Sequence, residues 1–506
     1  MNIIKNKISQ IVVLSLALLS LSSCSDWLDV KPETEEREQD MFTSYKGYKE
    51  ALAGCYVSMA SRDVYGENLT MSDVECLASL WKKPTKSWHA DWFYFYEHNY
   101  TADDSRNDIK AIYGGLFNVV VQANMIINHL AANPSSIADE DARNVVEGEA
   151  LALRAFCQFD VLRLFGQLPQ GGTKKVSLPY SESNDINTLP PYYTFEEYSR
   201  KLQNDLDKAE ELLAKSDPIL RHSYDDLEGG VTLDDDFMMY RRNRMNLWAV
   251  KALKARVYLY LGNTAKAHEE AMAVIDAKLD GAPVVELGGD ADYAKGYYAL
   301  PSECLFALQS SSLTDYSISL LGGLDDHSVD GDKNLCLTTN MLNKQLYAGQ
   351  NTTSNNLYLN VWNRNTRDVF GIKYPTIRKY SWDTSKNIDL DVLRTKLQIL
   401  PMLRLSEQYL IAMETANDLT EANALYTKYM AAHAVNVTAG YTSLDELKAF
   451  VTDEYRREFY GEGQMFYTYK RKNTKRMLFS NTDMEEDGYI LPLPESEFDP
   501  NQTSTR

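Results

Sequence analysis

The sequence predicts a mainly α-helical protein, with helices that pack in pairs and a long irregular region in its second half. Apolar residues recur at steps of three and four in the segments 40–280 and 400–470, which is the period of a helix with one buried face. Between residues 280 and 400 that period fails, and glycine, asparagine and aspartate interrupt the chain. The composition, 44% hydrophobic and 25% charged over 506 residues, is typical of a globular protein and excludes a disordered or multi-span membrane chain.

The charge balance argues against two kinds of partner. Lysine and arginine total 52 against 72 aspartates and glutamates, which gives a formal net charge of −20. Such an acidic surface argues against a nucleic-acid backbone or an anionic lipid surface as the main partner.

The N-terminus has the pattern of a secretory signal. Lys5 and Lys7 precede an apolar run over residues 8–21, which is too short for a membrane-spanning helix. The run ends in Leu-Ser-Ser-Cys, which resembles a bacterial lipobox, so we expect residues 1–23 to be removed and Cys24 to carry a lipid. The alternative is a secreted protein with an incidental cysteine. The mature chain, 24–506, is predicted to form a single domain.

The helix pairs are expected at intervals along the chain. Thr194 with Glu197 forms a capping box that starts the clearest helix, and Pro218 ends it. Ala255, Gly262 and Val274 have spacings that resemble a tetratricopeptide unit. The predicted pairs are 44–60 with 107–131, 147–165 with 194–215, 246–261 with 264–279, and 401–416 with 420–434. A generic helical bundle is the alternative.

Cysteines and arginines within apolar segments are predicted to be structural. The cysteines other than Cys24 are odd in number and irregularly spaced, which favours inert core thiols over disulfides or a zinc site; they are Cys55, Cys76, Cys157, Cys304 and Cys336. Arg154 and Arg404 lie in apolar helices, so each needs a carboxylate partner. The candidate partners are Glu149, Glu407, Glu458 and Glu462. A catalytic role for such pairs is the alternative.

Other catalytic and metal-binding patterns are incomplete. His268-Glu269 lacks the second histidine of a zinc-protease motif, and no phosphate-binding glycine loop occurs. Asp330, Asp332 and Asn334 begin like a calcium loop, but Leu335 stands where its glycine should be. We interpret this segment as a solvated acidic loop, with a weak metal site as the alternative. No catalytic residue, metal ligand or cofactor is predicted.

Motifs along the whole mature chain resemble the SusD/RagB family of outer-membrane nutrient-binding lipoproteins. The resemblance rests on the mature start at residues 24–32, on Gly-Glu-Ala at 148–150 and Leu-Arg-Ala-Phe at 153–156, on 163–166, on 403–410 and on 456–466. It implies a SusD-like fold of four tetratricopeptide-like pairs with an irregular half laid over them. It also implies a lipid-anchored, outward-facing protein of the outer membrane, with a SusC-like TonB-dependent transporter as partner.

Aromatic residues mark the candidate binding site. The segment 81–100 is rich in tryptophan and tyrosine, interleaved with lysine and acidic residues, and flat aromatic faces suit the C–H faces of sugars. Alternatively, Trp92, Tyr94 and Tyr96 face the core of a hairpin or loop. In the resembling family, stacking aromatics come from this early loop and from the irregular half. The candidates are therefore Trp81, Trp88, Trp92, Tyr94, Tyr96, Tyr297, Trp362 and Trp382.

These observations lead to one main functional hypothesis. The protein is expected to be a non-catalytic surface protein that binds oligosaccharides and delivers them to the transporter. Two alternatives remain open from the sequence: a surface-anchored glycoside hydrolase, or a peptide- or protein-binding member of the same uptake family.

Overall fold

The computed structural model describes residues 40–185, 189–323, 329–383 and 387–498. The predicted signal peptide and Cys24 lie outside the described residues. Helices dominate the described chain, and its strands are short and paired two by two, which confirms the mainly α-helical prediction.

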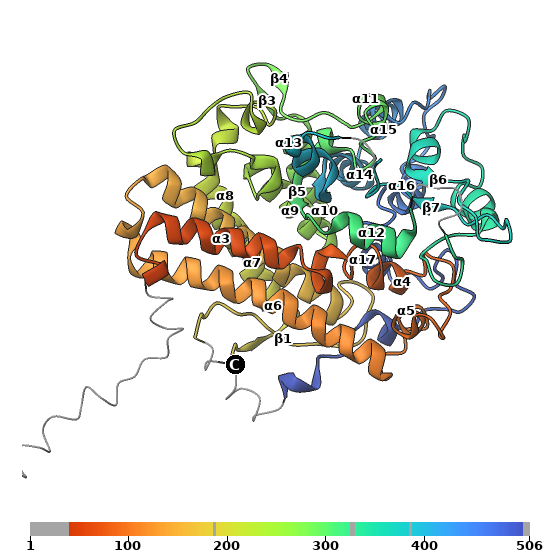
Figure 1. Cartoon of the computed structure of the whole chain (residues 1–506), viewed down its shortest axis with the longest axis horizontal. Coiled ribbons are helices and arrows are strands. Elements are labelled where there is room, and N and C mark those ends of the chain that lie inside the picture. The colour runs from red at the N-terminus through yellow and green to blue at the C-terminus, as the bar shows by residue number, and fades with distance from the viewer. Residues whose placement is uncertain (1–39, 186–188, 324–328, 384–386, 499–506) are drawn as a thin grey trace, which may run out of the picture.

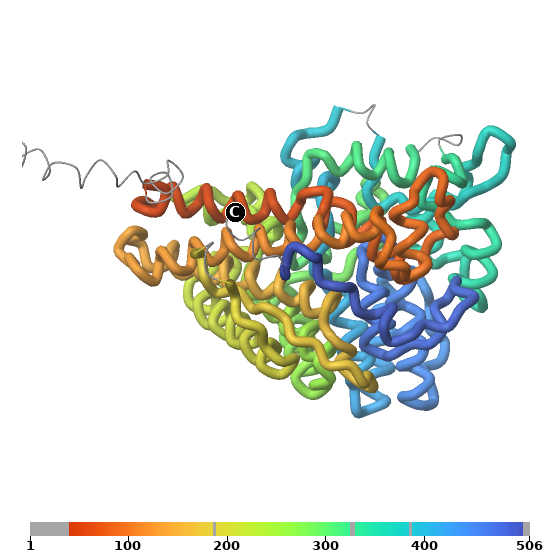
Figure 2. Tube along the Cα trace, turned by 90° about the horizontal axis from the view of Figure 1, so that it is seen from below, coloured from red at the N-terminus to blue at the C-terminus, as the bar shows by residue number. Residues whose placement is uncertain are grey.

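The first half of the scaffold is a row of long helices (Figures 1 and 2). Helix α3 packs on α6, α6 on α7 and α7 on α8, so two of the predicted pairs lie side by side in one layer. Helix α6 is long and apolar enough to cross a membrane by length and composition, but it packs here between α3 and α7. The helices are α3 (Tyr45–Met59), α6 (Asp103–Ala132), α7 (Glu140–Phe165) and α8 (Phe195–Ser216).

The second half of the scaffold continues the row. Helix α9 packs on α8 and α10, α10 contacts α14, and α14 contacts both α15 and α16. The predicted pairs α9–α10 and α14–α15 are therefore confirmed. The helices are α9 (Leu247–Tyr260), α10 (Thr264–Ile275), α14 (Leu405–Thr415), α15 (Leu419–Ala432), α16 (Leu444–Glu458) and α17 (Met465–Arg471).

Local sequence signals set several helix ends. The Thr194 hydroxyl accepts a hydrogen bond from the Glu197 amide, and the Glu197 carboxylate accepts one from the Thr194 amide at 3.1 Å. This reciprocal pair satisfies amides that have no partner inside the helix. Helix α8 then ends before Pro218, as predicted.

Two predicted helix boundaries were wrong. Residues 401–404 belong to strand β8 (Ile399–Arg404), which pairs antiparallel with β5 (Cys304–Gln309), and α14 begins only at Leu405. A short apolar run that is buried on all sides has no period that separates strand from helix. Helix α10 ends at Ile275, and β3 (Lys278–Leu279) forms a small hairpin with β4 (Ala282–Pro283).

Short elements build the irregular region and the early aromatic segment (Figure 1). Two of them, α4 and α5, lie on the same side of the molecule as β6 and β7 in both views. These elements are α4 (Asp73–Leu77), α5 (Ala90–Tyr96), β1 (Leu178–Pro179), β2 (Tyr192–Tyr193), α11 (Asp290–Ala294), α12 (Leu313–Leu321), β6 (Trp362–Asn363), β7 (Thr376–Ile377) and α13 (Leu390–Val392).

Buried ion pairs join the layers, as predicted for Arg154 and Arg404, although Arg404 ends strand β8 and does not lie in a helix. Arg154 of α7 donates to both carboxylate oxygens of Asp205 in α8, at 2.7 and 2.6 Å. Arg404 is surrounded by Glu303, Glu458 and Glu462. Two of the four predicted carboxylate partners therefore bind Arg404.

The other two predicted carboxylate partners bind arginines that the sequence did not single out. Glu149 pairs with Arg241 and Arg244, while Glu407 pairs with Arg256. The five cysteines other than Cys24 are all buried free thiols, as expected.

One ion pair predicts a dependence of stability on pH. Glu414, in the last turn of α14, accepts two hydrogen bonds of 2.9 Å from Arg471 of α17 and lies 2.7 Å from the Lys472 ammonium. Burial alone would raise the pKa of Glu414, but these two cations outweigh it and lower that pKa to about 2. The stabilisation is therefore present above the ordinary carboxyl pKa and is lost as the pH falls toward 2.

Glu414→Gln is expected to remove this acid-sensitive contribution, on the order of 2–3 kcal/mol at pH 7. Urea unfolding of wild type and variant at pH 7, 5 and 3 measures it, and the difference between the two proteins should shrink at pH 3. A difference that stays constant over this range would contradict the assignment.

Candidate functional site

The aromatic segment 81–100 folds as a buried tryptophan, a loop and a short helix. Trp81 is fully buried, and its indole N–H donates to the Met71 carbonyl at 2.9 Å. Residues 90–96 form α5, in which Trp92 and Phe95 are buried three positions apart while Tyr94 and Tyr96 are partly exposed. The alternating pattern of a hairpin is therefore wrong here, because a helix buries every third or fourth residue.

The loop between Trp81 and α5 is fastened to the irregular region. The Lys82 ammonium donates to the Gly331 carbonyl at 2.7 Å and to the Asp332 carboxylate at 3.1 Å. The Thr85 hydroxyl donates to the same carboxylate at 3.2 Å, and the His89 ring lies 2.8 Å from the Lys333 carbonyl. The two regions that the sequence marked separately thus form one surface.

We call this area the Trp88 surface; it comprises residues 82–89, residues 331–333 and Tyr374. Trp88 projects from it with 57% of its surface exposed, and the Lys333 ammonium lies 4.3 Å from its ring centroid. Tyr374 packs so closely under Gly331 that a Cβ at residue 331 would lie 2.3 Å from its ring. Exposed aromatic area, lysines and a carboxylate are therefore held together on a fixed backbone.

An apolar turn adjoins the Trp88 surface next to Tyr374, and sequence reasoning did not select it. Val369 and Phe370 are the most exposed large apolar side chains described, at 87% and 86%. The Asp368 carboxylate accepts hydrogen bonds of 2.9 Å from the amides of Phe370 and Ile372, which fixes the turn. The signal in the sequence was an Asp-Val-Phe-Gly run, a turn pattern that carries apolar residues where polar ones are usual.

Three of the eight predicted site residues are covered by other side chains. Trp81, Trp92 and Trp362 are all at most 4% exposed. Trp362 donates its indole N–H to the Tyr347 hydroxyl at 3.3 Å, and Tyr460 packs edge-on between Trp81 and Trp362, with ring centroids 5.0 and 4.8 Å away. These rings offer no free face to a sugar, so the structure corrects their candidate role: they form the core beneath the surface.

The other predicted residues keep exposed area but are dispersed. Tyr94 is half-buried with the Lys86 ammonium 4.8 Å from its ring, and the Tyr96 hydroxyl donates to the Phe479 carbonyl. Tyr297 follows α11 and Trp382 follows β7, and both are partly buried. Neither Tyr297 nor Trp382 belongs to the segments that form the Trp88 surface. Trp88 is the predicted residue with the most accessible ring.

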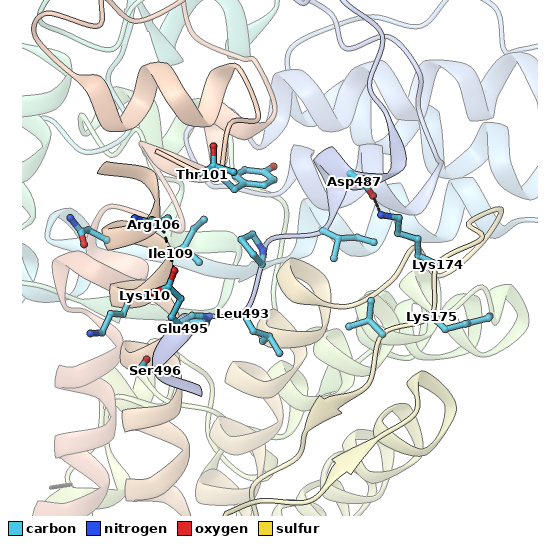
Figure 3. A pocket seen from close by; sticks show the side chains of 16 residues that line it. Thr101, Arg106, Ile109, Lys110, Lys174, Lys175, Asp487, Leu493, Glu495 and Ser496 are labelled. Carbon is cyan, nitrogen blue, oxygen red and sulfur yellow. Dashed lines mark hydrogen bonds and ion pairs between the residues drawn. The ribbon is translucent and has the colours of Figure 1, made fainter. Parts of the chain in front are cut away.

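A large cavity lies elsewhere, between α6, residues 174–176 and the C-terminal segment 487–496 (Figure 3). Its volume is about 950 Å³, and its wall carries Arg106, Lys110, Lys174 and Lys175. Arg106 pairs with Glu495 at 3.3 Å, and Lys174 pairs with Asp487. The cavity could not be predicted from the sequence, because the segment 487–496 lies more than 300 residues after the other two walls.

Sequence comparisons find SusD-like relatives. A SusD-like family model, described as starch-binding and associating with the outer membrane, matches residues 26–224. The SusD-like protein P2 of Formosa agariphila is 23% identical, over 97% of this chain and 96% of its own length.

Solved structures share the fold. A SusD superfamily protein from Bacteroides thetaiotaomicron superposes with a TM-score of 0.68 at 20% identity and covers 91% of this chain and 98% of its own. A laminarin-binding SusD-like protein superposes with a TM-score of 0.63 at 17% identity and covers 90% and 97%. The chain therefore shares its helical fold with solved SusD-like proteins. In sequence and in fold, the chain is similar to SusD-like proteins.

Proposed function

We propose that the protein binds oligosaccharides on the Trp88 surface and delivers them to a SusC-like TonB-dependent transporter. The observation that carries the proposal is the exposed Trp88 ring in a loop that is fastened on both sides, at Lys82 and at His89. A stacking ring on a fixed loop loses little conformational freedom when a sugar binds. Lys333 and Asp332, from the opposing segment, can hydrogen-bond sugar hydroxyls beside the ring.

The lowered pKa of Asp332 makes this residue unsuited to the proton-donating role in glycoside hydrolysis. Its hydrogen bond from Lys82, together with the charge of Lys82, lowers the pKa of the Asp332 carboxyl. A glycosidase needs a carboxylic acid whose pKa is raised, so that it can donate a proton to the leaving oxygen. Asp332 is shifted in the opposite direction.

Trp88→Ala is expected to weaken oligosaccharide binding about tenfold to a hundredfold, since a stacked aromatic ring contributes roughly 1–3 kcal/mol by analogy with aromatic–base stacking. Its melting temperature should stay near that of wild type, because the side chain is exposed. Calorimetric titration with malto- and laminari-oligosaccharides measures the first quantity, and a thermal melt measures the second.

Tyr240→Ala is the matched control, because Tyr240 is an exposed aromatic residue outside the Trp88 surface and should leave the affinity unchanged. The proposed function would be wrong if the wild-type protein bound no member of a broad glycan panel. It would also be wrong if the protein released reducing ends from the bound sugar. If sugar binding survives Trp88→Ala but is lost in Lys110→Ala or Lys175→Ala, the binding site is the cavity of Figure 3 and not the Trp88 surface.

Anchoring and delivery complete the proposal. The support for a lipid at Cys24 is the lipobox pattern, and the support for a transporter partner is the family resemblance. Detergent-free membrane fractionation and copurification with the barrel test these two parts separately from sugar binding.

A further inference from the structure

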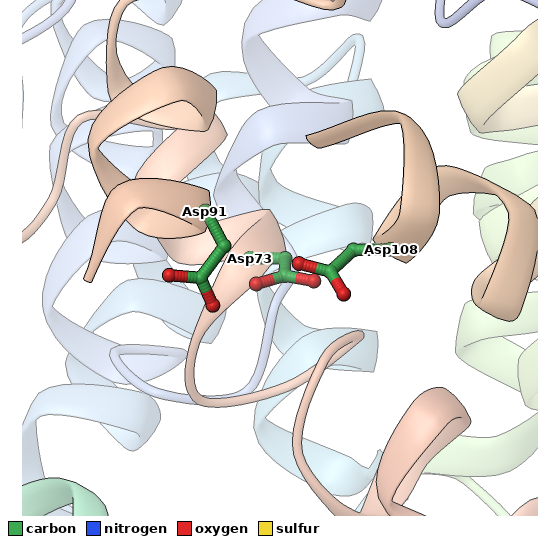
Figure 4. A group of neighbouring side chains, drawn as sticks. All are labelled: Asp73, Asp91 and Asp108. Carbon is green, nitrogen blue, oxygen red and sulfur yellow. The ribbon is translucent and has the colours of Figure 1, made fainter. Parts of the chain in front are cut away.

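Residues 82–89, which we call the Trp88 loop, connect α4 to α5, and three aspartates from α4, α5 and α6 meet in one cluster. Asp73 is the first residue of α4, Asp91 lies in the first turn of α5, and Asp108 lies in α6. One carboxylate oxygen of each lies within 4.8 Å of the others. Figure 4 shows the Asp73 carboxylate between those of Asp91 and Asp108. No spacing in the sequence links positions 73, 91 and 108, so the cluster exists only in the fold.

One oxygen of the central carboxylate lacks a hydrogen-bond partner. Asp73 is 1% exposed, and its Oδ2 atom receives no hydrogen bond; the neighbouring Ser72 hydroxyl is also buried without a partner. Buried polar atoms of folded proteins are almost always satisfied, and a buried charge without a counter-charge costs several kcal/mol. An unsatisfied carboxylate that faces two others therefore indicates a missing positive group.

The surroundings increase the demand for positive charge. Two further acidic residues, Asp63 and Glu67, are near the cluster, and the nearby Arg62 is already bonded to Glu67. When the three aspartates are ionised, their charges repel one another unless a cation neutralises them.

We propose that Asp73, Asp91 and Asp108 bind a calcium ion that fastens α4 and α5 to α6. Calcium prefers carboxylate oxygens at about 2.3–2.6 Å, so two of its ligands lie up to about 5 Å apart, which matches the spacing of the three oxygens. Asp91 and Asp108 are only partly buried, which leaves room for an ion to enter and for water to complete the coordination.

The position of this ion gives it a structural role. Helices α4 and α5 flank the loop that carries Trp88, while α6 belongs to the scaffold. An ion shared by the three helices would hold the loop against the scaffold without taking part in sugar contact. The calcium site does not depend on the proposed sugar binding, and it can be tested without any glycan.

The test compares wild type with Asp108→Asn after removal of metal with EDTA. Millimolar CaCl₂ is expected to raise the melting temperature of wild type by several degrees, because a ligand that binds only the folded state stabilises it. The rise should disappear in Asp108→Asn. Without metal the variant should melt no lower than wild type, because it removes a like charge. Terbium luminescence sensitised by Trp92, the residue after Asp91, should report binding that is at least about tenfold weaker in the variant.

Asp104→Asn is the matched control: it removes the same charge one turn earlier on α6, from an exposed residue outside the cluster. It should keep the calcium-induced rise. Asp91→Asn is the second ligand variant and should behave like Asp108→Asn, which keeps the test decisive if one variant folds poorly. The proposal would be overturned if calcium raised the melting temperature equally in wild type and both ligand variants. It would also be overturned if wild type showed no rise and bound no terbium. The cluster would then be neutralised by shared protons.

Discussion

Arg404→Met is expected to lower the free energy of unfolding by about 3–5 kcal/mol, the cost of removing one partner from a buried ion pair. The Arg404 guanidinium is 2% exposed and donates to Glu458 at 2.7 Å and to both carboxylate oxygens of Glu462 at 3.0 and 2.9 Å. It also pairs with Glu303, which precedes β5. Methionine fills much of the volume but leaves these carboxylates without their main counter-charge.

The effect should spread beyond one helix. Glu458 ends α16, Glu303 belongs to the irregular region, and Lys379 of that region also pairs with Glu462. The network therefore joins the irregular region to the C-terminal part of the scaffold, and its loss should loosen that junction. Urea unfolding monitored by tryptophan fluorescence measures the change.

Arg476→Met is the matched control, because Arg476 pairs with Asp483 on the surface, where both side chains are more than half exposed. Exposed pairs contribute about 0–1 kcal/mol, so this variant should unfold close to wild type. If Arg404→Met also stayed within about 1 kcal/mol of wild type, the network would not be the junction that its geometry indicates.

The helical scaffold could be predicted because its signals are local. The capping box at Thr194 and Glu197 lies within four residues, and the apolar period of each long helix repeats within its own length. The need of Arg154 and Arg404 for partners also follows from burial alone. The partner of Arg154 was missed, because Asp205 lies 51 residues away on a helix whose register only the fold defines.

The candidate site could be predicted only in part, because ring exposure depends on distant residues. The sequence located the early aromatic segment and the irregular region, but not the contact between Lys82 and Asp332 that unites them. It also could not separate Trp88 from Trp81, since the residue that covers Trp81 is Tyr460, far along the chain. The aspartates of the calcium proposal were missed for the same reason.

Trp362→Ala is expected to lower the free energy of unfolding by about 3–5 kcal/mol, as for other buried aromatic residues cut back to alanine. Trp362 is 1% exposed, and its ring meets Tyr460 edge-on. Because Tyr460 also contacts Trp81, the three rings bridge the irregular region, the C-terminal scaffold and the start of the Trp88 loop. The cavity left by alanine should therefore weaken the packing among these three regions at once.

Trp362→Ala also distinguishes an aromatic residue that stabilises the fold from one that contacts the sugar. At a temperature where Trp362→Ala remains folded, its affinity for an oligosaccharide should stay within a few-fold of wild type, whereas Trp88→Ala should lose affinity with an unchanged melt. Tyr460→Phe is the control for the core: the Tyr460 hydroxyl has no hydrogen-bond partner, so its removal keeps both ring contacts and should cost little stability. If Trp362→Ala lost sugar affinity while its unfolding free energy matched wild type, Trp362 would be a ligand contact after all and the division between core and surface aromatics would be wrong.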